Sequence, residues 1–489
     1  MTNLSDLFPA GAGKQVSFVA DGAISAAGKP VILNGAGTVS PVGPSPGSDV
    51  GTPVVFSSSN TDQTAATFDS NSNKVVFSYR DVGNSSYGTS VVATVSGTSI
   101  SYGTPVVFSS SNTQFIASTF DSSNNKVVIA YQDNPSTSYG TGIVGTVSGT
   151  SISFGSSAIF ESAGTTYIGA TFDSSNNKVV IGYKDEDNSG YGTAVVGTVS
   201  GTSISFGTPV VFETDSSQSK SLTFDSTANK VVIAYSDEGG ALKYGTAIVG
   251  TVSGTSISFG TAVVFEAAES TYISATFDSD ASKVVIVYED VPNTNSGTAI
   301  VGTVSGTAIS FGTAVVFNSG ESRWMAITFD SSSNEIVICF TDGSDGANKG
   351  KSYIGTVSGT SISFGSIFTF ESGSTNNIST TFDSNSNKVA TAFKDNHNSD
   401  YGTGVVISTT VTNLTAANFI GISDAAILDT ASGNVTIKGG IAATGLTSLT
   451  PGSDYYAQTD GTISTVTTSP AVKIGKAMSA TSINLEYQS

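Results

Sequence analysis

Several residue types that build catalytic and metal sites are scarce in this sequence. Its 489 residues include one cysteine, Cys339, and one histidine, His397. A lone cysteine excludes an intrachain disulfide and leaves the redox compartment undecided, and a lone histidine leaves no histidine cluster to bind zinc. Neither residue belongs to a nucleophile–base–orienter set of the kind used in covalent catalysis. We therefore expect no metal centre and no cofactor.

Positive charge and long apolar runs are also scarce. Nineteen Lys and Arg residues stand against 38 Asp and Glu, a net charge of −19, so a nucleic acid would be repelled. No stretch approaches the roughly 18 consecutive apolar residues of a membrane helix, and we expect no membrane insertion. The first residues, MTNLSDLFPAGAGKQ, lack the basic start and the apolar run of a signal peptide.

The dominant feature that is present is an internal repeat. The triplet Thr-Phe-Asp recurs seven times, and its aspartates lie 52 or 53 residues apart. These aspartates are Asp69, Asp121, Asp173, Asp225, Asp278, Asp330 and Asp383. A fixed period of this length is typical of repeat architectures.

Each copy contains four segments typical of β-strands. In the third copy they are Tyr167–Phe172, Lys178–Tyr183, Gly192–Val199 and Ser203–Phe212. β-branched and aromatic residues fill these runs, turn residues separate them, and no stretch has a helical period. Seven antiparallel four-stranded units predict an all-β fold, a seven-bladed β-propeller. A β-sandwich needs no strict period, and a solenoid repeat is usually much shorter.

The last copy predicts how the ring of blades closes. Six copies end in an Ile-Ser-Phe or Ile-Ser-Tyr strand that runs into the next copy, whereas the seventh passes from Val405 to Leu414 without one. An equivalent strand precedes the first copy, at Asp49–Phe56. With the blades numbered in chain order, we predict that this N-terminal strand completes blade seven and so removes two exposed sheet edges.

Both ends of the chain lie outside the repeat. Residues 1–47 contain two strand-like runs, Gln15–Val19 and Pro30–Leu33, before a stretch rich in Pro, Gly and Ser that is typical of a linker. Residues 413–489 alternate apolar and polar residues between turns. Because ring closure brings the two ends together, we predict one composite β-domain from 1–47 and 413–489, with the propeller at 48–412 inserted between them.

Successive turns of an antiparallel blade alternate between the two faces of the disc, and the two sets of turns differ in variability. The hairpins after the Thr-Phe-Asp triplets and the Ser-Gly-Thr turns change little, and we call their side the uniform face. The loops after the second strands vary, and we call their side the variable face; these loops are Asp81–Tyr87, Asp133–Tyr139, Asp185–Tyr191, Asp237–Tyr244, Asp290–Ser296, Asp342–Lys349 and Asp395–Tyr401. Variable loops on a rigid scaffold often carry recognition, so we predict that the variable face binds a ligand.

A ring of side chains is expected near the channel mouth on the variable face. Six residues before each Thr-Phe-Asp aspartate stand Gln63, Phe115, Tyr167, Ser219, Tyr272, Trp324 and Asn377. Four of them, Phe115, Tyr167, Tyr272 and Trp324, are candidate ligand-binding residues, because an aromatic ring can stack on a sugar while nearby polar groups bind its hydroxyls. Packing between adjacent blades is the alternative role of these rings.

Blade six departs most from the repeat. It carries Arg323 next to Trp324, the single cysteine, and a longer loop with Lys349 and Lys351. Arg323, Lys349 and Lys351 are further candidate ligand-binding residues, because a cationic cluster on an acidic protein suggests an anionic ligand or a partner contact. Sequence drift is the alternative explanation.

Aspartates follow every second strand, at Asp81, Asp133, Asp185, Asp237, Asp290, Asp342 and Asp395. Such a residue can accept hydrogen bonds from the following backbone amides and fix the turn, with cation or ligand binding as the alternative. The Asp69–Asn73 turn looks superficially like a calcium loop but lacks its Gly and its late Glu, so we interpret it as a hairpin.

Catalysis is weakly supported. Paired carboxylates for glycoside cleavage stay open, but the acidic residues mostly recur in every blade, whereas an active site should break the repeat symmetry. A sialidase-type propeller would need an arginine cluster, and Arg80 and Arg323 are the only arginines. We therefore predict no catalytic residues and a protein that is not an enzyme.

The chain ends also carry a family resemblance. The front reads LSDLFPAGAGKQVSFVADGAISAAGKPVILNGAGTVSPV, and the back contains NFIGISDAAI, GLTSLTPGSDYYAQTDGTIST and VKIGKAMSATSI. Together these segments resemble terminal modules of virion structural and tail-fibre-like proteins of marine tailed phages, including cyanophages. The resemblance implies an anchoring β-module that carries a variable central insert, and it brings no catalytic residues.

These observations predict a phage virion structural protein, a fibre or receptor-binding component whose variable face binds a host surface glycan or protein. The terminal domain would contact other virion proteins. We expect the chain in the virion after synthesis in the host cytoplasm, as a homo-oligomer, with a trimer as our guess, whose multivalency strengthens weak single sites. A non-catalytic capsid decoration or tail structural protein is the first alternative, and a glycan depolymerase is the second.

Overall fold

The computed structural model describes residues 14–35, 37–42, 44–134, 138–240, 243–412, 414–415, 417–458, 461–466 and 472–486. In these ranges the chain forms β-strands and one short 3-10 helix, η2 (Val82–Asn84), which confirms the all-β class. Among the same residues, no helix has the length and apolar character needed to cross a bilayer. The chain divides into two compact units, 48–409 and the pair 1–47 with 410–489, whereas the sequence placed the second boundary after 412.

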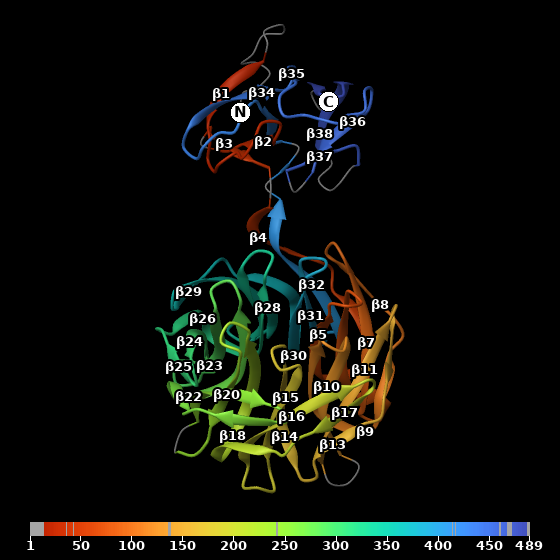
Figure 1. Ribbon diagram of the computed structural model, residues 1–489, viewed down its shortest axis with the longest axis vertical. Coiled ribbons are helices and arrows are strands. Elements are labelled where there is room, and N and C mark those ends of the chain that lie inside the picture. Colours follow the sequence, from red (N-terminus) through yellow and green to blue (C-terminus); the bar gives the residue numbers. More distant parts are fainter. Residues whose placement is uncertain are drawn as a thin grey trace. The chain divides into compact units, whose positions relative to one another are not determined.

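Residues 48–409 form a β-propeller in which every repeat contributes three long antiparallel strands (Figure 1). The innermost strands are β5 (Val54–Asp69), β9 (Val106–Asp121), β14 (Thr165–Asp173), β18 (Val210–Asp225), β22 (Val263–Asp278), β26 (Val315–Asp330) and β30 (Phe368–Asp383). The second strands are β6 (Lys74–Asp81), β10 (Lys126–Asp133), β15 (Lys178–Asp185), β19 (Lys230–Asp237), β23 (Lys283–Asp290), β27 (Glu335–Asp342) and β31 (Lys388–Asp395). The third strands are β7 (Tyr87–Ser96), β11 (Tyr139–Ser148), β16 (Tyr191–Ser200), β20 (Tyr244–Ser253), β24 (Ser296–Ser305), β28 (Lys349–Ser358) and β32 (Tyr401–Thr412).

The outer strand of a blade comes in two pieces, not in the single strand predicted at Ser203–Phe212. A short strand pairs with the second half of the third strand; these strands are β8 (Ser99–Tyr102), β12 (Ser151–Phe154), β17 (Ser203–Phe206), β21 (Ser256–Phe259), β25 (Ala308–Phe311) and β29 (Ser361–Phe364). The other half pairs with the start of the next long strand, as Val210 does opposite Ala194, or with the separate β13 (Ala158–Glu161) in blade two. The ladder breaks at Gly207–Pro209, and it breaks at the same place in blades that have alanine there, such as at Ala262 and Ala314, so the break does not depend on proline.

The ring closes through the N-terminal strand, as the sequence predicted. Val54 and Val55, at the start of β5, lie opposite Gly404 and Thr403 of β32, and the strand order forms a closed circle. The pairing pattern of one blade thus occurs seven times in the described residues. The linker-like stretch is instead a strand, β4 (Pro44–Val50), which lies between β32 and β5 in the strand order.

The hydrophobic core lies between the blades. Successive side chains of a strand point to opposite faces, yet Val179, Val180 and Ile181 of β15 are all fully buried, because a neighbouring blade covers each face. One buried cluster accordingly joins Val128 of blade two to Ile181 of blade three. This two-sided burial explains why the second strands are continuously apolar and do not alternate.

Each third strand packs closely against the following long strand, because a glycine of the third strand leaves room for a phenylalanine ring of the long one. A Cβ on Gly192 would lie 2.6 Å from Cε2 of Phe212, so only glycine leaves room for that ring. Phe212 in turn packs against Tyr235 of the next blade, with ring centroids 5.3 Å apart. The closing strand repeats the arrangement with Phe56, whose ring lies over Gly402.

The hairpins of the uniform face have the geometry that the sequence predicted. Asp173 accepts hydrogen bonds from the backbone amides of Ser175 and Asn176, at 2.9 and 3.0 Å, and Asn177 takes a left-handed φ of 53°. Asparagine tolerates that conformation better than most residues. The hairpin interpretation of these turns is therefore confirmed.

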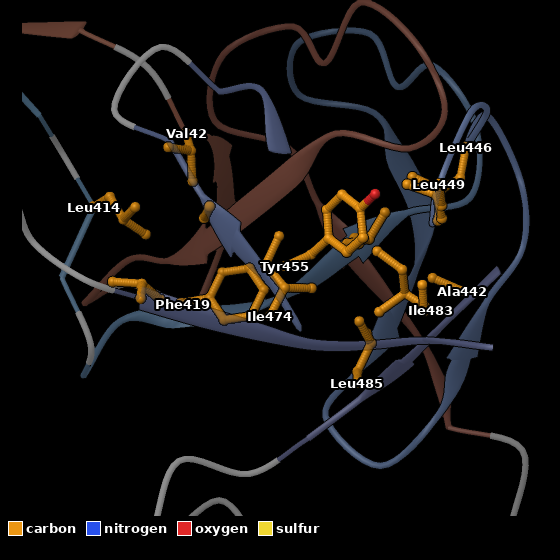
Figure 2. Close-up of a cluster of buried hydrophobic side chains, with 14 of the residues drawn as sticks. Val42, Leu414, Phe419, Ala442, Leu446, Leu449, Tyr455, Ile474, Ile483 and Leu485 are labelled. Atoms are coloured by element: carbon orange, nitrogen blue, oxygen red, sulfur yellow. The ribbon is translucent and has the colours of Figure 1, made fainter. Parts of the chain in front are cut away.

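Both chain ends build the second unit. One sheet has the order β1-β34-β33-β2-β3 and so interleaves N-terminal and C-terminal strands, and the other has the order β35-β39-β38-β36-β37. Their core joins Ile32 and Val42 to Phe419, Tyr455 and Ile474 (Figure 2). The strands are β1 (Gln15–Val19), β2 (Pro30–Leu33), β3 (Val39–Pro41), β33 (Phe419–Ser423), β34 (Ser432–Ile437), β35 (Ile441–Ala442), β36 (Asp454–Ala457), β37 (Ile463–Ser464), β38 (Val472–Ser479) and β39 (Ser482–Leu485). Strands from both chain ends thus share one sheet and one compact unit.

Removal of one ring should open the propeller at its closure. Phe56 is buried between blades seven and one and packs on Tyr79 with ring centroids 5.1 Å apart. We expect Phe56→Ala to lower the free energy of unfolding by about 3–5 kcal/mol, measured by urea denaturation. Val55→Ala is the control, because Val55 is exposed on the same strand. Equal effects of the two substitutions would contradict closure by this strand.

Candidate functional site

Every innermost strand contains a β-bulge at the same repeat position. In blade three Thr166 lies opposite Lys184 and Gly169 lies opposite Gly182, so Tyr167 and Ile168 together face one residue of β15. The register of the other innermost strands shifts at the equivalent place. An extra residue of this kind re-aims side chains and locally bends the strand.

The first residue of each bulge has a left-handed backbone although none of them is glycine. The residues are Gln63, Phe115, Tyr167, Ser219, Tyr272, Trp324 and Asn377, with φ between 45° and 51°. A non-glycine residue in this region costs on the order of 1–3 kcal/mol, and such strain collects at functional sites. The same strain occurs in every blade, at the position that faces the channel.

The bulges line a cavity of about 610 Å³ at the centre of the ring. Each blade contributes the strained residue and the one after it, and blades one, four and five add the preceding residue as well. The lining residues are Asp62, Gln63, Thr64, Phe115, Ile116, Tyr167, Ile168, Gln218, Ser219, Lys220, Thr271, Tyr272, Ile273, Trp324, Met325, Asn377 and Ile378. The volume falls in the range of pockets for small organic ligands, roughly 300–1,000 Å³.

Two aromatic pairs form opposed stretches of the cavity wall. Phe115 and Tyr167, on blades two and three, have ring centroids 5.3 Å apart, and Tyr272 and Trp324, on blades five and six, have centroids 5.1 Å apart. Ser219 of blade four lies between the pairs on one side of the ring, and the polar residues of blades seven and one lie between them on the other. We call this cavity, with two aromatic walls and two polar ends, the channel slot.

Hydrogen bonds hold the polar end at blades seven and one. The Asn377 side-chain amide donates to Asp62 Oδ1, and the Thr64 hydroxyl donates to the Asn377 carbonyl. Gln63 Oε1 accepts from the backbone N–H of Phe115, which ties the end to the neighbouring aromatic wall. Asp62 also lies 3.6 Å from a guanidinium nitrogen of Arg80. This end is therefore already ordered before a ligand arrives.

The tyrosine hydroxyls of the slot are protonated hydrogen-bond donors. Burial raises the pKa of Tyr167, and the Glu238 carboxylate acts in the same direction. Burial likewise raises the pKa of Tyr272, with Glu289 as the next cause. Both groups are thus neutral at pH 7 and can donate to an acceptor on a ligand.

The structure places the four predicted aromatic residues together in the slot. Phe115, Tyr272 and Trp324 also pack against buried clusters between the blades, which is the alternative role considered for these rings, and ligand binding stays a prediction. All four side chains are half-buried, which leaves part of each ring facing the cavity. The spacing of the repeat was a sufficient signal to find them.

The three predicted cations of blade six lie outside the slot and have acidic partners. Arg323 pairs with Glu321 and lies 3.9 Å from Glu289. Lys349 lies 2.6 Å from Asp345, and Lys351 pairs with Asp342. The expected cationic cluster is therefore neutralised locally, because each cation has a carboxylate within reach.

The aspartates after the second strands mostly fix loops, the first of the two roles considered. Asp395 accepts from the amides of His397 and Asn398, at 3.1 Å each, and Asp237 accepts from the Gly239 amide at 2.9 Å. Burial raises the pKa of Asp342, but the hydrogen bonds and charge of Lys351, with those from Ser344, outweigh burial and hold it below its usual range.

Other acidic groups give no metal centre by themselves. Glu213, Asp215 and Asp237 offer oxygens within 4.8 Å of one another, two of them half-buried and one exposed. Glu213 already accepts a hydrogen bond of 2.7 Å from the Tyr235 hydroxyl. Within the described part of the chain, Asp62 is the only carboxylate that lines the slot.

Sequence reasoning missed the second residue of each bulge. This residue is Thr64, Ile116, Ile168, Lys220, Ile273, Met325 or Ile378, and it lines the slot beside the strained one. The signal was present, because an alignment of the copies shows a lysine, Lys220, at a position that is apolar in five other blades.

Comparisons with known proteins support the fold. No family model matches the chain, and no curated protein matches it. The crystal structure of the BP39L lectin from Burkholderia pseudomallei matches with a TM-score of 0.52 and 11% identity, over 72% of this chain and 96% of that chain. The Dos1 propeller matches with a TM-score of 0.42 and 12% identity, over 78% of this chain and 81% of that chain. At these identities the first match shows that the fold is a β-propeller and nothing of its ligand.

The strained backbone of the bulges predicts an unusual order of substitutions. Ser219 has a φ of 45°, where a β-branched side chain is strongly disfavoured and glycine is free of strain. We expect Ser219→Val to lower the free energy of unfolding by about 1–3 kcal/mol and Ser219→Gly to leave it unchanged or slightly raised. Gln218→Val is the control, because residue 218 is regular strand. If Ser219→Val were as harmless as this control, the left-handed bulge would be refuted.

Proposed function

We propose that this protein is a non-catalytic, receptor-binding component of a phage particle, and that the channel slot holds a sugar ring of a host surface glycan. The observation that carries the proposal is the pair of aromatic walls, Phe115 with Tyr167 and Tyr272 with Trp324. A pyranose has apolar faces and a polar rim. Aromatic walls and polar ends complement such a ring, and rigid inner strands keep the site formed before binding.

Three further points support this function. The slot lies near the variable loops, since Thr61, two residues before Gln63, pairs with Asp81 at the start of a variable loop. A protein with a similar fold is named a lectin. The chain ends resemble terminal modules of phage fibre-like proteins, which suggests that the composite domain attaches to other virion proteins. Several copies on one particle would turn weak sugar sites into firm attachment.

The slot does not favour a glycan depolymerase. Hydrolysis of a glycosidic bond generally uses two carboxyl groups that flank it. In the described part of the chain Asp62 is the single acid of the slot, and Asn377 and Arg80 already engage it. Binding without cleavage is the function that this set of side chains supports.

The proposal has an intrinsic optical test, because Trp324 is the only tryptophan of the chain and lies in the slot. Glycans of host surfaces are first screened on an array for those that bind the protein. A glycan found in this way is then titrated in solution, and it should change the fluorescence of Trp324 until the signal saturates. Loss of one aromatic wall in Tyr167→Ala should weaken binding about tenfold, equivalent to about 1.4 kcal/mol.

Lys349→Ala is the matched control, since Lys349 lies on the same face but outside the slot. We expect this variant to bind as the parent protein does. A retained glycan that leaves Trp324 fluorescence unchanged and binds Tyr167→Ala normally would place the site elsewhere, and retention of no glycan would reject sugar binding. The virion role is tested by electron microscopy of phage particles incubated with an antibody to the propeller. Particles that bind none of this antibody would contradict the role.

A further inference from the structure

Lys220 breaks the symmetry of the channel slot. The equivalent residues of blades two, three, five, six and seven are Ile116, Ile168, Ile273, Met325 and Ile378. In blade four an amine therefore occupies a position where five of the other blades have an apolar side chain and blade one has Thr64. Lys220 lines the slot at the polar end between the two aromatic walls, yet its side chain is only 9% exposed.

The amine of Lys220 has one carbonyl partner and no acidic one. Its Nζ donates to the backbone carbonyl of Ser217 at 2.8 Å, and none of the ion pairs in the described part of the chain involves it. The equivalent carbonyls of blades three and seven accept instead from the preceding blade, from Gln132 Nε2 at 2.6 Å and from Thr341 Oγ1 at 2.8 Å. In blade four the carbonyl thus accepts its hydrogen bond from an amine, whereas in blades three and seven the donor is an uncharged amide or hydroxyl.

The environment favours the uncharged amine. Burial lowers the pKa of Lys220 well below its usual value, and the nearby Lys184 acts in the same direction, against Glu186 and Glu238. A neutral amine can donate one N–H to Ser217 and still has a free lone pair. A desolvated lysine of this kind in an apolar pocket is a nucleophile for carbonyl groups.

We propose that Lys220 is a covalent capture site for aldehydes that enter the channel slot. The Nζ lone pair attacks the aldehyde carbon and forms a C–N bond, and the resulting carbinolamine loses its oxygen as water together with both amine protons. The product is an imine, so no oxidant or reductant is consumed. When protonated, this imine has one N–H, which can stay on the Ser217 carbonyl.

The aldehyde has two possible sources with the same chemistry. One is a free short aldehyde, and the other is the open-chain form of a reducing sugar held between the aromatic walls. The capture reaction does not depend on the proposed receptor function, because it requires only that the slot admits the aldehyde.

Reductive trapping tests the proposal on the full chain. The protein is incubated at pH 7 with glycolaldehyde and sodium cyanoborohydride, and labelled lysines are identified by peptide mass spectrometry. We expect Lys220 to be labelled about tenfold or more faster than the exposed lysines of the protein, because an ordinary lysine amine is almost fully protonated at this pH. Between pH 7 and pH 9 the exposed lysines should accelerate about tenfold per unit, and Lys220 much less.

Lys220→Met is the matched variant, because methionine stands at this position in blade six. By intact-protein mass spectrometry, the parent protein should gain one label quickly. Lys220→Met should lose this fast labelling, whereas Lys243→Arg should keep it. Slow labelling of Lys220, or labelling that rises with pH in parallel with the exposed lysines, would overturn the proposal. A second arm replaces glycolaldehyde with a reducing disaccharide or with its alditol, which has no aldehyde. If the disaccharide labels Lys220 and the alditol does not, the source is a reducing sugar. If glycolaldehyde labels Lys220 and the disaccharide does not, the source is a small free aldehyde.

Discussion

The structure depends on one constraint, namely that no blade can bury its own apolar faces. The second strands carry Val179, Val180 and Ile181 in succession, and only neighbouring blades on both sides cover such a run. An open array would leave two such faces in water, so β5 must return to β32 and close the circle. Closure in turn makes the innermost strands a rigid collar around a channel. The channel slot is a consequence of this collar together with the bulges that shape it.

The bulges shape the inner ends of the blades into one cavity. A regular innermost strand would alternate its side chains and present every second residue to the channel. The extra residue re-aims the chain at one level, so that Tyr167 and Ile168 both reach the cavity. The cost is a left-handed backbone at a residue other than glycine in every blade, and the gain is a dense ring of side chains that can differ from blade to blade. Aromatic residues at four of these positions and polar ones at three give the slot its walls and its ends.

Much of this fold can be predicted from the sequence because the same pattern of strands and turns recurs in seven copies. Pattern and spacing predicted the closing strand, the four aromatic residues of the channel slot, and the strands Gln15–Val19 and Pro30–Leu33. The split outer strand at Gly207–Pro209 was missed because the pattern of apolar residues continues across it. The bulge was missed because its evidence is a backbone angle and a register shift, and neither changes the residue count between repeats. Lys220 was missed for a related reason, since its meaning depends on the apolar neighbours that only the aligned copies or the structure provide.

The central claim is that the channel slot, and not the outer surface of the loops, is where this propeller binds its ligand. The most direct test is an experimental structure of the protein in complex with a glycan that it retains. The account predicts density for one sugar ring between the pair Phe115 and Tyr167 and the pair Tyr272 and Trp324, with its hydroxyls toward Ser219 and Asn377. A glycan bound on the variable loops or on the rim of the blades, with the slot free of it, would contradict the account.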